Sequence, residues 1–272
     1  MIRDRYAEWG TEEISIFGGI PFFTLLKRET LRFVKNPVVT IAPPIISQIL
    51  YILVFGLVLG SRIGDVGTHT YISFMFPGLV MMALLSNSFM NPSWSMFAGR
   101  HFGWIEPILT SPLSYTQIAT SYILAGIFRG LFVGGILLFG AFLIPGIPVV
   151  YSIFHILLYL LVVAFVAASA GCLVGLWAKK FDHIALVMNF ALFPLVFLGG
   201  VFYSLEMIEG VGFLETLVKL NPITHMINGL RYGMIGFSDI NLVPGLILLP
   251  ILAFSLFGLS VKLIHDGYNL RE

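Results

Sequence analysis

The sequence predicts an all-α fold, an integral membrane bundle of six transmembrane helices that forms a single domain over residues 1–272. Composition is the first reason: 58% of residues are hydrophobic and 11% are charged, against roughly 25% charged in a soluble domain. Mean hydropathy is +0.95. The formal net charge of +1 leaves no basic surface that could hold a nucleic-acid backbone. A soluble domain and a nucleic-acid-binding protein are therefore both excluded.

The second reason is the spacing of the charges. About 20 apolar residues cross the roughly 30 Å hydrocarbon core of a bilayer. Six stretches satisfy this length, approximately residues 38–60, 71–92, 117–144, 149–177, 184–203 and 242–264. Residues 130–178 contain no Asp, Glu, Lys or Arg, but the Pro-Gly-Ile-Pro turn at residues 145–148 divides this run into two helices.

The third reason is the distribution of Lys and Arg, which cytoplasmic loops retain. Only Arg62, Lys219 and Arg231 fall on one side of the predicted membrane, and Arg129 lies within a span. All other Lys and Arg residues fall on the side of the N-terminus. We therefore expect a multi-pass membrane protein with both termini in the cytoplasm. The charged first twenty residues predict no cleavable signal peptide.

The N-terminal segment, residues 1–37, is expected to be cytoplasmic and to include an amphipathic helix over residues 21–36, which lies on the inner membrane surface. Its cations are Lys27, Arg28, Arg32 and Lys35. Pro21 suits a first helical turn. The helix either anchors the topology or also contacts a cytosolic partner. Residues 265–272 form the expected cytoplasmic tail.

The inner loop over residues 99–114 carries an apolar edge of Trp104, Ile105, Ile108 and Leu109. Arg100 and Glu106 supply opposite charges, and Pro112 interrupts the segment before the next helix. Two interpretations stay open: a short interfacial helix packed on its own bundle, or a surface that a partner contacts.

The outer segment over residues 204–239 is the longest that does not span the membrane. Its apolar residues have helical spacing up to Asn221-Pro222. Two short outer helices that dip into the membrane or lie flat on it are therefore expected.

Taken together, the six spans, the amphipathic helix, the loop from Arg100 to Pro112 and the paired outer helices resemble the ABC type-2 (ABC-2) transporter permease family. Several strings add to the resemblance: Gly60-Ser-Arg-Ile-Gly-Asp65, Phe76-Pro-Gly-Leu79, Ala178-Lys-Lys-Phe-Asp182, Gly199-Gly-Val-Phe-Tyr-Ser204, Asn221-Pro-Ile223 and Arg231-Tyr-Gly233. The similarity extends over nearly the whole chain.

The resemblance implies an exporter of a bacterial or archaeal cytoplasmic (inner) membrane, in which a permease homodimer pairs with two copies of a cytosolic ATP-binding-cassette ATPase. The loop from Arg100 to Pro112 would be the coupling helix, with Glu106 and the helix near residues 27–35 as further contacts. Where relatives commonly have a second acidic residue, this chain has Pro107, which suits only a first helical turn, so the coupling helix is expected to start later here.

This chain contains no Gly-Lys dipeptide and hence no Walker A loop. It is therefore not expected to be an enzyme or to hold a cofactor of its own, and ATP and Mg²⁺ are expected in the partner ATPase. The six histidines have no metal-ligand spacing, and Cys172 is a lone cysteine, so no metal site is expected. No nucleophile elbow or intramembrane carboxylate pair points to catalysis.

Arg129 lies inside the third predicted span, where an arginine costs about 2.5 to 3.5 kcal/mol and must face protein or water. It is either clamped by backbone carbonyls or by amides such as Gln48, Asn87 or Asn189, or it contacts an anionic headgroup or sugar phosphate, or it snorkels to the interface.

The fifth span carries the aromatic residues that could line a translocation path: Phe190, Phe193, Phe197, Phe202 and Tyr203. The resemblance implies that the first, second and fifth spans line this path. Packing or lipid contact is the competing interpretation. Pro194 and Gly199-Gly200 could let the helix bend or let two copies pack closely.

The expected function is the membrane subunit of an ATP-driven exporter for a hydrophobic or amphipathic substrate, such as a drug-like molecule, a lipid, a glycolipid or a polysaccharide. The alternative is a gradient-driven secondary transporter or channel without an ATPase. Such proteins usually place carboxylates at mid-depth, whereas every Asp and Glu here lies outside the predicted spans.

Overall fold

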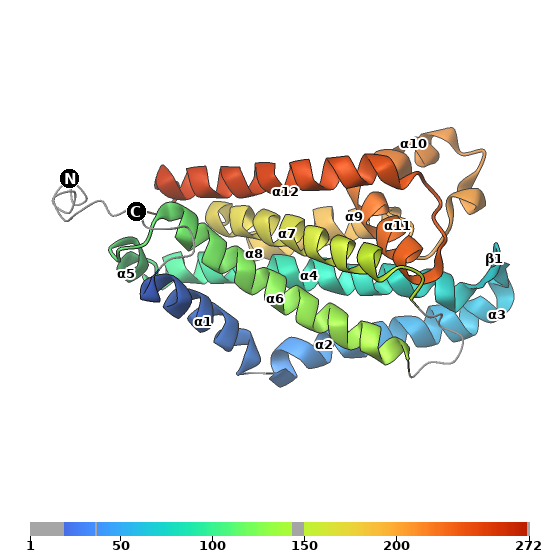
Figure 1. Ribbon diagram of the computed structural model, residues 1–272, viewed down its shortest axis with the longest axis horizontal. Coiled ribbons are helices and arrows are strands. Elements are labelled where there is room, and N and C mark those ends of the chain that lie inside the picture. The colour runs from blue at the N-terminus through green and yellow to red at the C-terminus, as the bar shows by residue number, and fades with distance from the viewer. Residues whose placement is uncertain (1–18, 36, 143–149, 271–272) are drawn as a thin grey trace.

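A computed structural model describes residues 19–35, 37–142 and 150–270. It is an elongated helical bundle whose long helices follow the long axis (Figure 1). The short helix α5 (Glu106–Leu109) lies at one end of the bundle, and strand β1 (Asp65–Val66) lies at the other. These ends are called the α5 end and the β1 end below. The predicted all-α class is thus confirmed apart from one hairpin, in which β1 pairs antiparallel with β2 (His69–Thr70).

The central helix is α4 (Tyr71–His101), whose side chains are almost all buried. It packs against α6 (Tyr115–Ala141), α7 (Ile153–Trp177) and α11 (Pro222–Ile235). Close approach of α7 depends on Gly171 and Gly175, since a Cβ at Gly175 would lie 2.7 Å from the carbonyl oxygen of Ser93. Small residues four apart commonly bring membrane helices together in this way.

The helices α6 and α12 (Leu242–His265) begin at side-chain caps. Ser114 and Gln117 form a capping box at the start of α6, and the Asn241 side chain accepts a hydrogen bond from the Val243 amide. These caps satisfy amide groups that a helix N-terminus leaves unpaired. α12 packs on α7 and ends at the α5 end, where α1 (Ile20–Val34) begins (Figure 1).

The first predicted span is one continuous helical run of three segments: α2 (Pro37–Tyr51), the π-helical η1 (Ile52–Leu59) and α3 (Gly60–Ile63). Pro43 and Pro44 lie inside α2. Five other helical segments of the described chain are long and apolar enough to cross a membrane, whereas the apolar stretch here, Thr40–Gly56, is shorter. The structure therefore confirms five of the six predicted spans by length, and the first stays a prediction.

The fifth predicted span contains α8 (Phe181–Val187), the π-helical η2 (Met188–Leu192) and α9 (Phe193–Leu198). Pro194 is the second residue after the π segment, in the first turn of α9. Because proline donates no backbone hydrogen bond, the wider turn accommodates the break in the bonding pattern. The predicted turn at residues 145–148 lies outside the described residues.

The segment between the fifth and last spans contains the 3₁₀ turn η3 (Leu205–Ile208), α10 (Gly212–Leu220) and α11, with the break at the predicted Asn221-Pro222. Asn221 caps α11, and Gly236 ends it in the left-handed conformation, with φ of 72°. Most of α11 is buried against α4, α7 and α12. α11 therefore penetrates the bundle and does not lie flat on its surface.

Candidate functional site

The predicted coupling helix is α5, which begins at Glu106 with Pro107 in its first turn. The proline thus opens the helix, as its missing N–H allows. Ile105 is only 2% exposed, and it packs with Ile108, Leu25 of α1 and Leu270 in a small core at the α5 end. The prediction that Ile105 belongs to a contact surface is therefore wrong, because the loop turns this side chain inward. Leu109 is half-buried against the same core.

The exposed part of the loop is aromatic. Trp104 is 57% exposed and Phe102 is 55% exposed, and their rings stack with centroids 5.1 Å apart. Gly103 between them has φ of 73°, a conformation that favours glycine. Glu106 and Pro112 are also exposed. Phe102 is absent from the predicted contact residues, although a loop aromatic next to glycine could have indicated it. We call Phe102 and Trp104 the aromatic knob.

Arg100 does not face outward with the knob. Its guanidinium donates to the carbonyl oxygens of Gly175 and Ala178 at 2.7 and 2.6 Å, and to that of Asn269 at 3.1 Å. These acceptors lie at the end of α7 and in the segment after α12. The predicted contact role of Arg100 has no support in this arrangement, in which the guanidinium joins the ends of three helices.

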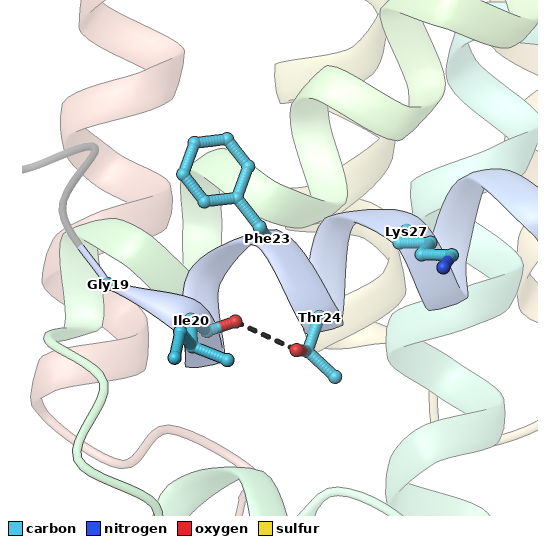
Figure 2. A pocket seen from close by; sticks show the side chains of 5 residues that line it. All are labelled: Gly19, Ile20, Phe23, Thr24 and Lys27. Carbon is cyan, nitrogen blue, oxygen red and sulfur yellow. Dashed lines mark hydrogen bonds between the residues drawn. The ribbon is translucent and has the colours of Figure 1, made fainter.

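Helix α1 buries Phe22, Leu25, Glu29 and Phe33 on one face, which packs mainly against α6. Lys27, Arg28 and Lys35 are exposed. The exposed side near the N-terminal end forms a shallow recess lined by Gly19, Ile20, Phe23, Thr24 and Lys27 (Figure 2). In it the Thr24 hydroxyl donates to the Ile20 carbonyl at 2.8 Å. α1 therefore belongs to the bundle and offers only its outer face to a membrane or partner.

Glu29 is the buried charge on the packed face of α1. Its carboxylate accepts hydrogen bonds from Arg28 at 2.7 Å and from Ser95 of α4. Burial lowers the pKa of Arg28, but the hydrogen bond and charge of Glu29 outweigh this and raise the pKa overall. The sequence analysis did not single out Glu29, although its four-residue spacing from both Leu25 and Phe33 places it on the apolar face.

Arg32, one helical turn further along, reaches α4. Its Nη2 donates to both the backbone carbonyl and the side-chain oxygen of Asn91 at 3.2 Å, and its Nη1 lies 3.7 Å from Glu29. Burial lowers the pKa of Arg32, although the negative charge of Glu29 acts to raise it.

Arg129 lies on α6 between Gly126 and Gly130, which pack against Pro92 and Ser88 of α4. One turn further along α6, Phe132 meets Phe33, the neighbour of Arg32 in α1, with ring centroids 6.5 Å apart. Among the residues that the structure describes, none accepts a hydrogen bond from the buried Nε of Arg129. None of the three suggested amides clamps Arg129 in the described part of the chain. The buried Gln48 Oε1 accepts no hydrogen bond there, Asn87 donates to the Ala83 carbonyl of its own helix, and Asn189 is exposed. We call Arg28, Glu29, Arg32, Asn91, Ser95 and Arg129 the α1–α4–α6 polar cluster.

The aromatic residues of the fifth span occupy different environments. Phe202 lies 4.4 Å from Phe55 and 5.7 Å from Phe197, between ring centroids. Phe193 packs against the large hydrophobic core that surrounds α4. The Tyr203 hydroxyl donates to the Leu198 carbonyl at 2.7 Å. Phe190 is 79% exposed. The structure thus joins Phe197 and Phe202 to the first predicted span but does not bring Phe190 into this group.

Arg231, placed by sequence reasoning in an outer loop, is fully buried in α11. It pairs with Asp239 at 2.8 Å and donates to the carbonyl oxygens of Phe74 and Gly200 at 3.2 and 2.6 Å. Its guanidinium also lies 3.8 Å above the Phe74 ring. Burial raises the pKa of Asp239, while Arg231 opposes that shift. The contacts are structural, since they tie α11 to α4 and to the turn after α9.

No group of three or more metal-binding side chains occurs within the described ranges, and Cys172 is buried. The features of the described chain that could meet a partner or ligand are therefore the aromatic knob, the α1–α4–α6 polar cluster and the aromatic cluster of Phe55, Phe197 and Phe202.

Residues 21–235, which form most of this membrane bundle and include its exposed loop helix, match the ABC-2 type transporter family. The chain belongs to this family. It is therefore a membrane permease component of an ABC transporter. The Inner membrane transport permease YadH of Escherichia coli (strain K12) is 40% identical over 248 residues, which cover 90% of this chain and 94% of the relative. Nodulation protein J of Azorhizobium caulinodans is 22% identical over 253 residues, which cover 90% of this chain and 96% of the relative.

Proposed function

We propose that this chain is the permease subunit of an inner-membrane exporter that works as a homodimer with two copies of a cytosolic ATP-binding-cassette ATPase. The aromatic knob is the observation that carries the proposal. Its two rings are more than half exposed, while Ile105 and Ile108 anchor the same loop in the core. Exposed aromatic residues on a rigid support are typical anchors of protein interfaces. The α5 end, where α1 begins and α12 ends, would then face the cytoplasm.

The translocation path would lie between the two copies. The fifth span is largely uncovered, since only 17% of its helical residues Phe181–Leu198 are buried. Phe197 of this span and Phe202 just after it form an aromatic cluster with Phe55 of the first predicted span. Pairing of two such faces would enclose an aromatic, weakly charged path. Such a lining favours hydrophobic or amphipathic cargo, including drug-like molecules and lipid-linked sugars.

Co-purification tests the ATPase partnership. The tagged chain is purified from its native membrane in mild detergent, and the eluate is analysed by mass spectrometry and ATPase assay. We expect the wild type to retain an ATPase that contains a Walker A sequence. Replacement of both Phe102 and Trp104 by alanine should reduce retention at least tenfold, because two interface anchors of about 1 to 2 kcal/mol each are lost.

Phe139→Ala is the matched control, because Phe139 is 70% exposed and lies in the last turn of α6, far along the helix from the loop that carries the knob. This variant should retain the ATPase at the wild-type level. Full retention by the Phe102/Trp104 double variant would show that the knob does not dock a partner. A wild-type chain that transports in vesicles without any ATPase would instead favour the gradient-driven alternative.

A further inference from the structure

The α1–α4–α6 polar cluster carries more positive charge than its own residues neutralise. It contains three arginines, Arg28, Arg32 and Arg129, and one carboxylate, Glu29. Arg28 and Ser95 already occupy that carboxylate. Within the described part of the chain, no carboxylate forms an ion pair with Arg129. With each arginine counted as +1 and Glu29 as −1, the cluster has a net charge of +2.

Two of the polar atoms left unpaired in this cluster can only donate hydrogen bonds. The Nε of Arg129 and the Nδ2 of Asn91 are both buried, and neither has a hydrogen-bond partner among the described residues. Buried donors without acceptors are costly and uncommon. Two unpaired donors and excess positive charge in one place favour an acceptor that carries negative charge, because hydrogen bonds between ionised groups are the stronger ones.

The position of the cluster along the bundle indicates where this acceptor comes from. α4 has 31 residues and is about 46 Å long at about 1.5 Å per residue, whereas the hydrocarbon core is roughly 30 Å thick. With the β1 end of α4 at one boundary, the hydrocarbon ends near Asn91. On this placement, the Arg32–Asn91 hydrogen bonds lie at the depth of the phospholipid headgroups at the α5 end.

The cluster is also accessible from outside the bundle. The side chain of Arg28 is 50% exposed and that of Arg32 is 33% exposed. Arginine recognises phosphate oxygens through its planar set of N–H donors.

We propose that Arg32 and Arg129 bind the phosphate group of an anionic phospholipid from the membrane leaflet at the α5 end. This bound lipid is distinct from transported cargo, and its site requires only that the chain spans a membrane.

The test measures which lipid the purified chain retains. The chain is reconstituted in nanodiscs of phosphatidylcholine with a minor fraction of phosphatidylglycerol, extracted into detergent, and analysed for bound lipid by native mass spectrometry. We expect the wild type to retain phosphatidylglycerol in preference to phosphatidylcholine. Arg129→Gln and Arg32→Gln should each reduce this retention about tenfold, the effect of losing a charged hydrogen bond.

Lys27→Gln is the matched control, since Lys27 is an exposed cation of α1 outside the cluster, and it should retain phosphatidylglycerol as the wild type does. Arg129→Lys keeps the charge without the planar donors and should give intermediate retention. Size-exclusion profiles show whether each variant folds. If Arg129→Gln does not fold, Arg32→Gln alone tests the proposal, because the Arg32 side chain is partly exposed and its replacement disturbs packing less.

Three results would each overturn the proposal: equal retention by the wild type and both glutamine variants, equal retention of the two lipids by the wild type, or displacement of the lipid by millimolar inorganic phosphate, which would show that the site takes free phosphate. The measurement needs neither ATPase nor transport, so its failure would leave the proposed exporter function untouched.

Discussion

At the scale of single residues, Arg231 and Lys219 form ion pairs in opposite environments. The Arg231–Asp239 pair is almost fully buried, whereas the Lys219–Glu215 pair, at 2.5 Å, is exposed on α10. Breaking a buried pair leaves an uncompensated charge and costs about 3 to 5 kcal/mol, whereas an exposed pair contributes about 0 to 1 kcal/mol. The two pairs therefore offer a matched comparison.

Arg231→Gln should lower the free energy of unfolding by about 3 to 5 kcal/mol, because Asp239 would lose its counter-charge and the Phe74 and Gly200 carbonyls would lose a donor. Lys219→Gln should change it by less than about 1 kcal/mol. Titration with denaturing detergent, followed by tryptophan fluorescence, measures both. Similar losses in the two variants would contradict the structural role assigned to Arg231.

Glu29 gives a second test at this scale. Glu29→Gln keeps the shape of the side chain but removes the charge that Arg28 and Arg32 share, so we expect the free energy of unfolding to fall by about 1 to 3 kcal/mol. Glu209→Gln, at an exposed position, should stay within about 0.5 kcal/mol of the wild type. The same detergent titration compares them, and an unchanged Glu29→Gln would mean that α1 does not depend on this contact.

At the scale of elements, glycines set the distance between α4 and α7. A Cβ at Gly171 would overlap the carbonyl group of Phe89. Gly171→Ala should therefore push the helices apart and destabilise the bundle by about 1 to 3 kcal/mol, measured as a lower thermal unfolding midpoint in detergent.

Gly135 of α6 is the control for this substitution, because a Cβ there would meet no atom within 4 Å. Gly135→Ala should raise the unfolding midpoint or leave it unchanged, since alanine is favoured over glycine in a helix by up to about 1 kcal/mol. A similar loss from both alanine variants would show that glycine flexibility matters more than the packing distance.

The elements also show which features the sequence could predict. Hydropathy located five spans to within a few residues at most ends, because each lipid-crossing helix needs a long apolar run. The exception is α4, which continues to His101 beyond the predicted end near Pro92, since protein covers it throughout. The Gly171–Gly175 spacing was present in the sequence as a packing signal, although the analysis did not use it.

The candidate site was less predictable, for reasons of three-dimensional contact. Nothing local distinguishes Ile105, which turns into the core, from Trp104, which is exposed. Arg100 and Arg231 looked like loop charges because the carbonyl groups that hold them come from helices distant in sequence. Glu29 was different, since its spacing from Leu25 and Phe33 already placed it on the buried face.

At the scale of the whole molecule, segments that are far apart in the sequence pack together at the α5 end. The chain after α12 returns to the end of α7, where the Asn269 side chain donates to the Leu176 carbonyl at 3.2 Å, and Leu270 is buried beside Ile105 and Ile108. The loop, α1 and the ends of α7 and α12 therefore share one small core.

Arg100 gives this unit a mechanical consequence. Because its guanidinium holds the last carbonyls of α7 and the chain after α12, a push on the neighbouring loop cannot bend that loop alone. We expect a displacement of the loop to move the ends of α4, α7 and α12 together, because one guanidinium joins all three.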